Sequence, residues 1–521
     1  MGYISASLGG LGLFLLGMWL ITEGLRVAAG PSLERLLSSW TSSRWRGLVS
    51  GTLLTVMVQS SSAVTVAALG FVNTGLLRFE RAVWVIFGSN LGTTLTAWLV
   101  AMIGFSFKID LFALPIIGVG ALLRVFAPFD RYRSLGMALA GFGLLFMGIQ
   151  VLSSGFGQMG ERLSLGMAGQ PLVLMVGIGV LLTTLMQSSS AALAVVLTAL
   201  AGGVIDFGGA AALVIGANVG TTSTALLSTL GATVQARRLA VAHVLFNLLT
   251  ALVALALLGP GVDLVVAVAS GWGLAPPGQL ALFHTAFNAL GIVLMWPLEP
   301  VLTRFLLTRF KERQRATAQL QFLDRNVADL PDAARTALAR EIERILARYP
   351  DALGGLPRPH DERLKGIAER RQLLAGLGDF LAMAGRQQLT EEQVNGFRIG
   401  WRIQLNLSNM EDALAGMNEH GRQMIRQPDH EVAMAVLAAW FEQMHQQLRR
   451  GGDPTEPLRF AYEQVKDALM QRAMDGALTR YTLDLALQDL SLSRRFLEQW
   501  WRATVHLRAL LDDPEQQAPL P

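Results

Sequence analysis

The chain of 521 residues has no cysteine, which excludes disulfides, thiol chemistry and thiolate metal sites. Charge is scarce in its first part, because residues 1–310 hold only 24 Asp, Glu, Lys and Arg, whereas residues 311–521 hold 58. Long apolar runs take the place of charge, at 9–22, 82–103, 134–152, 171–186, 239–259 and 280–298. Runs of about 20 apolar residues can cross a bilayer as helices. The sequence therefore predicts a membrane domain over 1–309 and a soluble domain over 310–521.

The first part has fewer acidic than basic residues, and this imbalance accounts for the isoelectric point near 9.7. Residues 1–310 carry 15 Lys and Arg against 9 Asp and Glu, and the cations fall in short segments between the apolar runs. Such a distribution is typical of membrane orientation and lipid contact rather than of nucleic-acid binding. No basic region precedes the first apolar stretch, so we expect residues 5–25 to be a retained helix, not a cleaved signal peptide.

An internal duplication is the strongest pattern in the sequence. QSSSA at 59–63 reappears at 187–191, and GSNLGTTLTA at 88–97 reappears as GANVGTTSTA at 216–225, both at an offset of 128. A weaker match relates GLFLLG at 12–17 to GLLFMG at 143–148, at an offset of 131. We predict one repeat over about 5–127, a second over about 134–259 and a further span over 279–303. Internal repeats that enclose polar residues within apolar sequence are typical of membrane transporters.

The segment 47–75 is predicted to be a re-entrant hairpin, because the polar QSSS interrupts it halfway and leaves arms of about 11–13 residues. A second hairpin is predicted over 171–203. Crossings are expected at about 82–103, 109–123, 134–152, 208–231, 239–259 and 279–303. Three crossings then separate the two hairpins, so the hairpins enter the membrane from opposite sides and the repeats are inverted.

This topology places most cations on one side of the membrane. The first side collects Arg26, Arg35, Arg44, Arg46, Arg78, Arg81, Arg124, Arg131, Arg133, Arg237, Arg238, Arg304 and Arg309, whereas the other collects Lys108 and Arg162. The bias predicts that the first side is cytoplasmic. The protein is therefore expected in the plasma or inner membrane as a multi-pass protein, and the domain over 310–521 is expected in the cytoplasm.

The repeated motifs offer neutral oxygen and nitrogen atoms for a dehydrated ion. No Lys or Arg lies inside the proposed spans, so an anion would be held by free N–H groups and the positive dipole end of a broken helix, together with serine hydroxyls. The predicted substrate-binding residues are Gln59, Ser60, Ser61, Ser62, Gln187, Ser188, Ser189 and Ser190. Oxygen atoms also suit sodium, and the predicted sodium-binding residues are Asn90, Thr93, Thr94, Asn218, Thr221 and Thr222. Co-bound sodium would offset the charge of the anion, and Gly92 and Gly220 would loosen the backbone beside these residues.

Two weaker signals have a structural alternative. The pattern H-x-x-F-N occurs at His243 and Asn247 and again at His284 and Asn288, which places each pair on one helix face. These four residues are candidates for supporting contacts around the site, although fixing helix packing is the favoured interpretation. Small residues such as Ser, Thr and Gly also mediate close helix packing, so for any single Ser or Thr packing is at least as good an explanation as ligand binding.

Paired QSSS motifs, each followed by G-[SA]-N-[LV]-G-T-T, resemble those of the type II sodium-dependent inorganic phosphate cotransporter family. The resemblance covers about residues 5–305. It implies sodium-coupled transport of phosphate, with Na⁺ as the co-transported ion, inverted repeats, and QSSS near the bound ions. Electrogenic vertebrate relatives tie an additional sodium to a membrane aspartate, whereas Asp110, Asp206 and Asp263 fall near the ends of spans here. The stoichiometry and the net charge moved are therefore left open.

The sequence after residue 310 predicts an antiparallel bundle of helices, with apolar residues at helical spacing in 335–349, 362–384, 394–417, 430–448, 458–476 and 482–511. By position and helical pattern it resembles the PhoU-like domain of prokaryotic relatives, which implies a regulatory role and a cytoplasmic partner. The acidic metal motifs of PhoU have no clear match. The nearest carboxylates are Glu369, Asp379, Glu411 and Asp412, which we interpret as solvated rather than metal-binding.

Other functions are weighed against sodium:phosphate symport. A symporter for another oxyanion such as sulfate and a membrane-bound phosphate sensor both stay open, although a sensor would need only one stable site. An enzyme is not expected, because the sequence shows no convincing nucleophile–base pair, metal cluster or phosphate loop. The direction of flux and the oligomeric state, including a homo-oligomer, are not encoded in these motifs.

Overall fold

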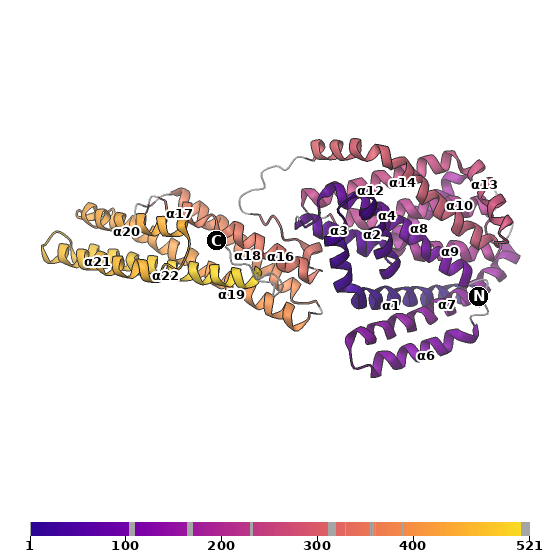
Figure 1. The fold of residues 1–521 in the computed structure, drawn as a ribbon, viewed down its shortest axis with the longest axis horizontal. Coiled ribbons are helices and arrows are strands. Elements are labelled where there is room, and N and C mark those ends of the chain that lie inside the picture. Colours follow the sequence, from indigo (N-terminus) through magenta and orange to yellow (C-terminus); the bar gives the residue numbers. More distant parts are fainter. Residues whose placement is uncertain are drawn as a thin grey trace. The chain divides into compact units, whose positions relative to one another are not determined.

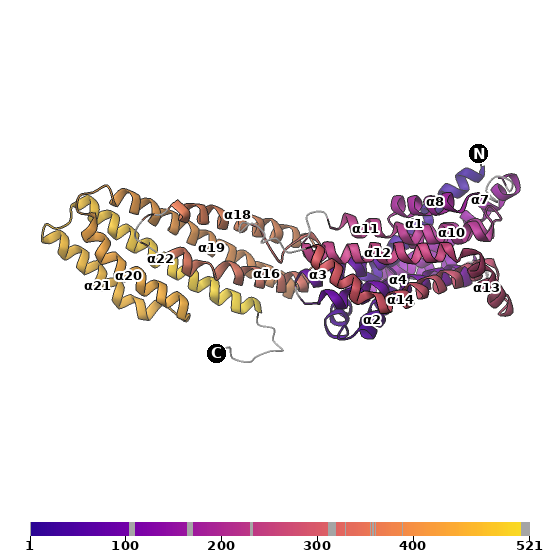
Figure 2. The same cartoon turned by 90° about the horizontal axis from the view of Figure 1, so that it is seen from above.

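The computed structural model of the chain describes residues 2–74, 76–103, 110–163, 170–229, 233–310, 319–328, 330–354, 356, 359, 361–387 and 389–511. These residues form helices and turns, without a strand among them, as the all-α prediction requires. The chain divides into two compact units, Met1–Lys311 and Glu312–Pro521, near the residue at which the charge density changes (Figures 1 and 2).

The first unit contains α1 (Gly2–Ser39), α2 (Arg44–Val58), α3 (Ser61–Asn73), α4 (Phe79–Trp98), the π-helix η1 (Leu99–Ile103), α6 (Asp110–Phe126), α7 (Asp130–Leu163), α8 (Leu172–Met186), α9 (Ser189–Ala201), α10 (Phe207–Gly220), α11 (Thr222–Leu227), α12 (Val234–Ala256), α13 (Leu258–Gly271) and α14 (Pro276–Arg309). The helix bounds repeat with the same offset of 128 residues as the motifs. The bounds of α2 recur in α8, those of α3 recur in α9, and α10 begins 128 residues after the start of α4. Related sequence therefore gives related local structure in both repeats.

Among the described residues of this unit, six helices are long and apolar enough to cross a membrane: Ser5–Ala29, Phe79–Met102, Asp130–Gly157, Phe207–Leu227, Val234–Ala256 and Pro276–Arg309. The predicted crossing over 109–123 corresponds to α6, which is a shorter apolar helix of 17 residues. The predicted crossing over 208–231 is broken at Thr221 into α10 and α11. The helix α13 was not expected from the sequence.

The helices α1 and α7 pack closely along a seam of glycines. A Cβ atom at Gly10, Gly17 or Gly24 would approach the α7 backbone near Leu152, Leu145 and Ser134, respectively, within 3.0 Å. The residue number of the contact on α7 falls as that on α1 rises, so the two helices are antiparallel. These glycines recur as 141, 148 and 155 at the offset of 131 that the sequence indicated, so elements related by the duplication pack against each other in opposite directions.

A second set of glycine contacts shows the direction of the helices in each hairpin. In the first repeat, Gly47 meets Trp84 and Gly92 meets Thr55, so residue numbers rise together along α2 and α4, and the two helices run parallel at very short separation. In the second repeat, Gly216 meets Val176 and Gly220 meets Thr183, so α8 and α10 have the same arrangement. If α2 and α3 formed one continuous crossing, α4 would have to run antiparallel to α2. The parallel packing instead means that the chain reverses between α2 and α4, as a hairpin requires.

The second unit is a bundle of long helices (Figure 2). It contains α15 (Arg325–Ala328), α16 (Pro331–Leu346), α17 (Tyr349–Leu353), α18 (Asp361–Ala384), α19 (Glu391–Met424), α20 (His430–Arg450), α21 (Thr455–Met474) and α22 (Arg480–Leu511). The six predicted helical segments are all present. Their apolar faces meet in one core, in which Leu407, Met410 and Phe496 are fully buried.

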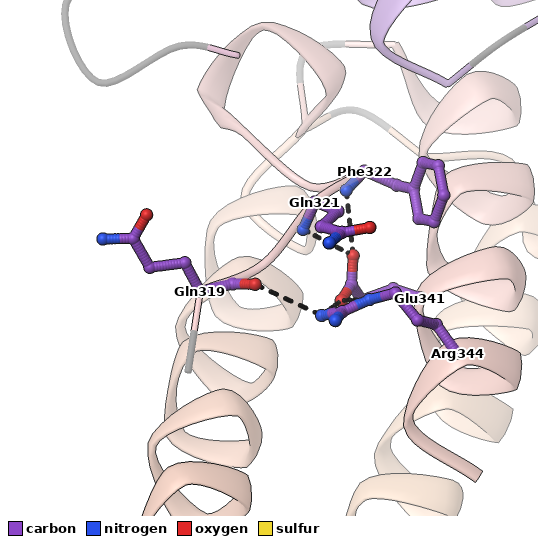
Figure 3. A network of polar contacts seen from close by, with 5 residues as sticks. All are labelled: Gln319, Gln321, Phe322, Glu341 and Arg344. Atoms are coloured by element: carbon purple, nitrogen blue, oxygen red, sulfur yellow. Dashed lines mark hydrogen bonds and ion pairs between the residues drawn. The ribbon is translucent and has the colours of Figure 1, made fainter. Parts of the chain in front are cut away.

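Buried charges in this bundle are paired. Glu341 of α16 is fully buried, accepts the backbone N–H groups of Gln321 and Phe322 at 2.8 Å, and binds the Arg344 guanidinium, which also reaches the carbonyl of Gln319 at 3.2 Å (Figure 3). This network ties the start of the unit to α16.

One predicted property of the acidic residues in this unit is wrong. Glu411 was interpreted as solvated, but it is fully buried and holds Arg370 through two hydrogen bonds of 2.6 and 3.1 Å. The two side chains come from α19 and α18, so the ion pair links those helices. A buried charge is tolerated only with such a partner, and the pattern of the sequence did not show which partner was available.

Candidate functional site

Each QSSS motif forms a break between two short helices. In the first repeat α2 ends at Val58, Gln59 adopts a left-handed conformation with φ of 55°, and α3 begins at Ser61. The Ser60 hydroxyl caps α3 by accepting the N–H of Ala63 at 3.2 Å. A left-handed residue followed by an N-cap residue ends one helix and starts the next in a different direction.

The second motif repeats this geometry. Gln187 has φ of 51° at the end of α8, and the Ser188 hydroxyl accepts the N–H of Ala191 at 3.2 Å at the start of α9. Among the described residues, Gln59 and Gln187 are the two non-glycine residues with positive φ. A left-handed conformation costs a residue with a side chain about 1–2 kcal/mol. Strain of this kind concentrates at functional sites, and here it occurs twice at related positions.

The breaks leave polar groups free on both sides. The first N–H groups of α3 and α9 have no partner within their helices, and Ser61, Ser62, Ser189 and Ser190 lie in these first turns. Unpaired N–H groups and the positive end of the helix dipole favour an anion. The side-chain amides of Gln59 and Gln187 each donate back to the preceding helix, to the carbonyls of Val56 at 2.7 Å and Thr184 at 2.6 Å, so their oxygen atoms are left to accept.

Two threonines that the sequence analysis missed, Thr96 and Thr224, contact residues of the first QSSS motif. The Thr96 hydroxyl donates to Gln59 Oε1 at 2.9 Å, and the Ser62 hydroxyl lies 3.4 Å from the Thr224 hydroxyl. Thr96 and Thr224 are equivalent positions, since each is the last threonine of its G-T-T-x-T motif. The second contact joins the two repeats, because Ser62 belongs to the first and Thr224 to the second. The recurrence of that last threonine was the signal that could have identified them.

The asparagines of the two repeats meet at one acceptor. Asn90 of α4 and Asn218 of α10 both donate to Asn247 Oδ1 of α12, at 3.1 and 2.8 Å, and Asn218 also lies 3.4 Å from Asn288 Oδ1 of α14. All four amides are buried, with at most 5% of each residue exposed. The motifs that the sequence placed 128 residues apart are therefore adjacent in space. Their amide nitrogens are engaged by protein, which leaves only amide oxygens for a cation.

The four motif threonines bind backbone carbonyls of their own helices. Thr93 donates to Ser89 O at 3.0 Å and Thr94 to Leu91 O at 2.8 Å, whereas Thr221 and Thr222 donate to Asn218 O and Val219 O. A hydroxyl that donates keeps lone pairs with which it can accept or bind a cation.

The neighbouring glycines were expected to loosen the backbone. Gly92 instead lies inside α4, whereas Gly220 is the last residue of α10, directly before the break at Thr221. A Cβ atom at either position would overlap Thr55 or Thr183, each at 2.7 Å. These glycines therefore allow close helix packing.

The H-x-x-F-N pairs surround the asparagine centre. His243 Nε2 lies 3.3 Å from Asn90 Oδ1, and the Asn247 amide donates to the His243 carbonyl at 3.1 Å. The Asn288 amide donates to the His284 carbonyl at 2.9 Å in the same way. Both histidines are buried. The pairs thus position the acceptors of Asn90 and Asn218 and belong to the polar network between the repeats.

A multi-pass membrane protein with two helix breaks and a buried polar centre has the features of a membrane transporter. The sequence model of the Na⁺/Pi-cotransporter family matches residues 13–154 and 158–270, and the chain belongs to this family. No solved structure matches the chain.

Three relatives show how far the similarity extends. Over 423 residues the chain is 25% identical to "Putative inorganic phosphate export protein YjbB" of Escherichia coli strain K12. This alignment covers 79% of the present chain and 76% of the relative. It is 28% identical over 301 residues to "Uncharacterized protein YqeW" of Bacillus subtilis strain 168, covering 56% of this chain and 94% of that protein. It is 36% identical over 97 residues to the rat "Sodium-dependent phosphate transport protein 2A", covering 18% and 15%. The match to the first relative is longer than the first unit, so it extends into the helical bundle.

Proposed function

We propose that the protein transports inorganic phosphate across the membrane together with sodium ions, through a site that the two QSSS breaks and the asparagine centre form near the middle of the bilayer. The observation that carries this proposal is the convergence of both repeats on Asn247, because Asn90 and Asn218 donate to the same oxygen. Phosphate would bind the N-terminal turns of α3 and α9 with Gln59 and Gln187. Sodium would bind oxygen atoms of the asparagines and threonines, including Thr93, Thr94, Thr221 and Thr222.

The directions of the helices support inverted repeats. The first hairpin follows the C-terminal end of α1, whereas the turn after the second hairpin, at Gly202, packs on Phe156 near the C-terminal end of α7. Because α1 and α7 are antiparallel, these are opposite ends of the pair. Hairpins that enter from opposite sides allow alternating access to one central site.

The absence of charge at the site supports coupling to sodium. The polar groups described at the two breaks are amides, hydroxyls and backbone groups, so the charge of phosphate has to be offset by ions that bind with it. The name of one relative refers to export and that of another to sodium-dependent transport. The same site can serve either direction, since the ion gradients decide the net flux.

The second unit is proposed to be a cytoplasmic, PhoU-like regulatory domain. Arginines support this orientation: Arg44, Arg81 and Arg304 line one cavity, and Arg238 donates to the carbonyl of Phe310, so these cations share the end of the first unit from which the chain leaves. Lys108 and the side chain of Arg162, which were predicted for the opposite side, lie outside the described residues. The positive-inside rule then assigns the arginine end to the cytoplasm.

Uptake of labelled phosphate into proteoliposomes, with and without a sodium gradient, tests the proposed function. Gln187→Gly keeps a residue that accepts the left-handed backbone and removes the amide, so we expect a folded protein whose uptake falls at least tenfold. Gln187→Asn is the matched control, because asparagine tolerates the same backbone and retains an amide; it should keep more uptake than the glycine variant. Sodium-independent uptake, or full uptake by Gln187→Gly, would refute the proposal.

Two further measurements address the alternatives. Competition by arsenate but not by sulfate is expected for a phosphate site, and the reverse would indicate a transporter for another oxyanion. A phosphate sensor would bind phosphate and show no sodium-driven accumulation in the same vesicles.

A further inference from the structure

A cavity with charged residues in its lining lies at the arginine-bearing end of the first unit. Its volume is about 560 Å³, and its lining comes from the starts of α2 and α4 and the last turns of α14, with Ser43, Arg44, Arg81, Trp84, Glu299 and Arg304 among the lining residues. The start of α2 is 15 residues from Gln59, or roughly 22 Å along a helix, so the cavity is separate from the helix breaks. Its volume falls within the range of about 300–1,000 Å³ that is usual for small-molecule sites.

The charges around this cavity are incompletely paired. Glu299 is buried, forms an ion pair with Arg44 at 3.1 Å and accepts a hydrogen bond from the Thr303 hydroxyl at 2.6 Å. Within the described part of the chain, Arg81 and Arg304 form no ion pair. Glu80 is exposed at the lining and leaves a net charge of one positive unit on the cavity. The cavity therefore presents two guanidinium groups without partners.

One residue of the lining, Trp84, carries a buried donor without a partner. Trp84 lines the cavity, is 1% exposed, and its indole Nε1 has no hydrogen-bond partner among the described residues. An unpaired buried N–H group is costly, so such a group indicates a missing acceptor. The ring of Trp84 is fixed by the rings of Trp296 and Phe87, with centroids 4.7 and 5.5 Å away. The donor is thus held in place before any ligand binds.

The N-terminal ends of two helices add positive electrostatic potential to the cavity. Both α2 and α4 begin at this cavity, since Ser43 and Arg44 mark the start of α2 and Glu80 and Arg81 lie in the first turn of α4. The N-terminal ends of helices carry partial positive charge. Together with the guanidinium groups and the indole N–H, they make a site complementary to an anion with several oxygen atoms.

We propose that this cavity binds a terminal phosphate group, held by Arg81, Arg304 and the indole N–H of Trp84. Two sources carry this chemistry: the headgroup of an anionic lipid such as phosphatidic acid, and free inorganic phosphate from the cytoplasm. The location suits a headgroup, because Trp45, Trp84 and Trp296 form an aromatic cluster beside the cavity, and tryptophans gather at the membrane interface. Basic pockets between membrane helices on the cytoplasmic side bind phosphorylated headgroups.

Binding to the purified full-length protein in a neutral detergent without sodium tests this site. Three probes are titrated separately by microscale thermophoresis: dioctanoyl phosphatidic acid, dioctanoyl phosphatidylcholine and inorganic phosphate. The paired change Arg81→Gln and Arg304→Gln should weaken binding of the phosphate-bearing probe at least tenfold. The matched control removes two exposed arginines outside the cavity, Arg237→Gln and Arg309→Gln, and should weaken it less than threefold.

A third variant separates loss of the site from loss of the fold. Trp84→Phe keeps an aromatic ring, removes the indole N–H together with part of the bicyclic ring, and is expected to weaken binding several-fold with an unchanged elution volume on size exclusion. Selective binding of phosphatidic acid identifies the lipid as the ligand, whereas binding of inorganic phosphate that survives Gln59→Gly and Gln187→Gly identifies the free ion at this second site. Binding that is equal for both lipids, or equal in the paired arginine variant and its control, would overturn the proposal.

Discussion

The shared acceptor at Asn247 gives the sharpest test of the centre between the repeats. Asn247→Leu keeps the number and branching of the side-chain heavy atoms and removes the oxygen that Asn90 and Asn218 bind. It also removes the amide that donates to the His243 carbonyl. Two buried amide N–H groups then lose their acceptor at the interface of α4, α10 and α12.

The cost follows from the number of bonds lost. Hydrogen bonds between membrane helices contribute about 0.6 kcal/mol on average and at most about 1.7 kcal/mol. A buried donor left without any acceptor costs about 1–3 kcal/mol. Asn247→Leu should therefore destabilise the protein by roughly 1–4 kcal/mol. At about 2 °C per kcal/mol for a unit of this size, the midpoint of thermal unfolding should fall by about 2–8 °C.

Asn288→Leu supplies a matched comparison. Asn288 lies at the equivalent place in its H-x-x-F-N pair and donates to the carbonyl of His284 just as Asn247 donates to that of His243. It accepts only one further hydrogen bond, from Asn218 at the longer distance of 3.4 Å. Thermal unfolding in detergent, followed by tryptophan fluorescence, should therefore show a smaller loss for Asn288→Leu. An equal loss in both variants, or no loss for Asn247→Leu, would refute the idea that one oxygen joins the repeats.

Two predictions concern packing and titration. In α8, Gly179→Ala places a Cβ against the Leu213 carbonyl and should destabilise the protein by about 1–3 kcal/mol or more. The control Gly177→Ala meets nothing within 4 Å and should be neutral or stabilising. Equal expression and equal unfolding midpoints for the two variants would contradict close packing of α8 on α10. In the bundle, burial raises the pKa of Asp489 to about 6, and the hydrogen bond to Asp489 raises the pKa of His420. Both folded-state pKa values lie above the unfolded ones, so the folded bundle holds protons that the unfolded chain releases; stability should fall as pH rises from about 4 to 6 because of Asp489, and again above the usual pKa of histidine because of His420. Asp489→Asn should flatten this dependence of the unfolding midpoint on pH, and an unchanged slope would show that other groups control it.

Most of the helices and their order could be predicted from the sequence because hydrophobic periodicity and length are local properties, whereas α13 and the break between α10 and α11 were missed. The hairpins were predicted for the same reason: a run of Gln and Ser within apolar sequence marks a break wherever it occurs. The duplication added a second, independent copy of each observation. This is why the bounds of α2 and α3 recur in α8 and α9.

The contacts between repeats could not be predicted. Thr96 and Thr224 became candidates only when their distances to Gln59 and Ser62 were known. Gly92 carries no local sign that it faces Thr55 rather than loosening a turn. Likewise, the partner of buried Glu411 depends on which helix packs beside α19. Such properties arise from side chains distant in sequence, and helical periodicity does not specify them.

The common oxygen of Asn247 has a consequence for the transport cycle. If both of its bonds persist, α4 and α10 cannot separate or slide without α12, so these three helices would move as one unit. Since Gly92 packs against Thr55 of α2 and Gly220 against Thr183 of α8, the first arm of each hairpin would move with the same unit.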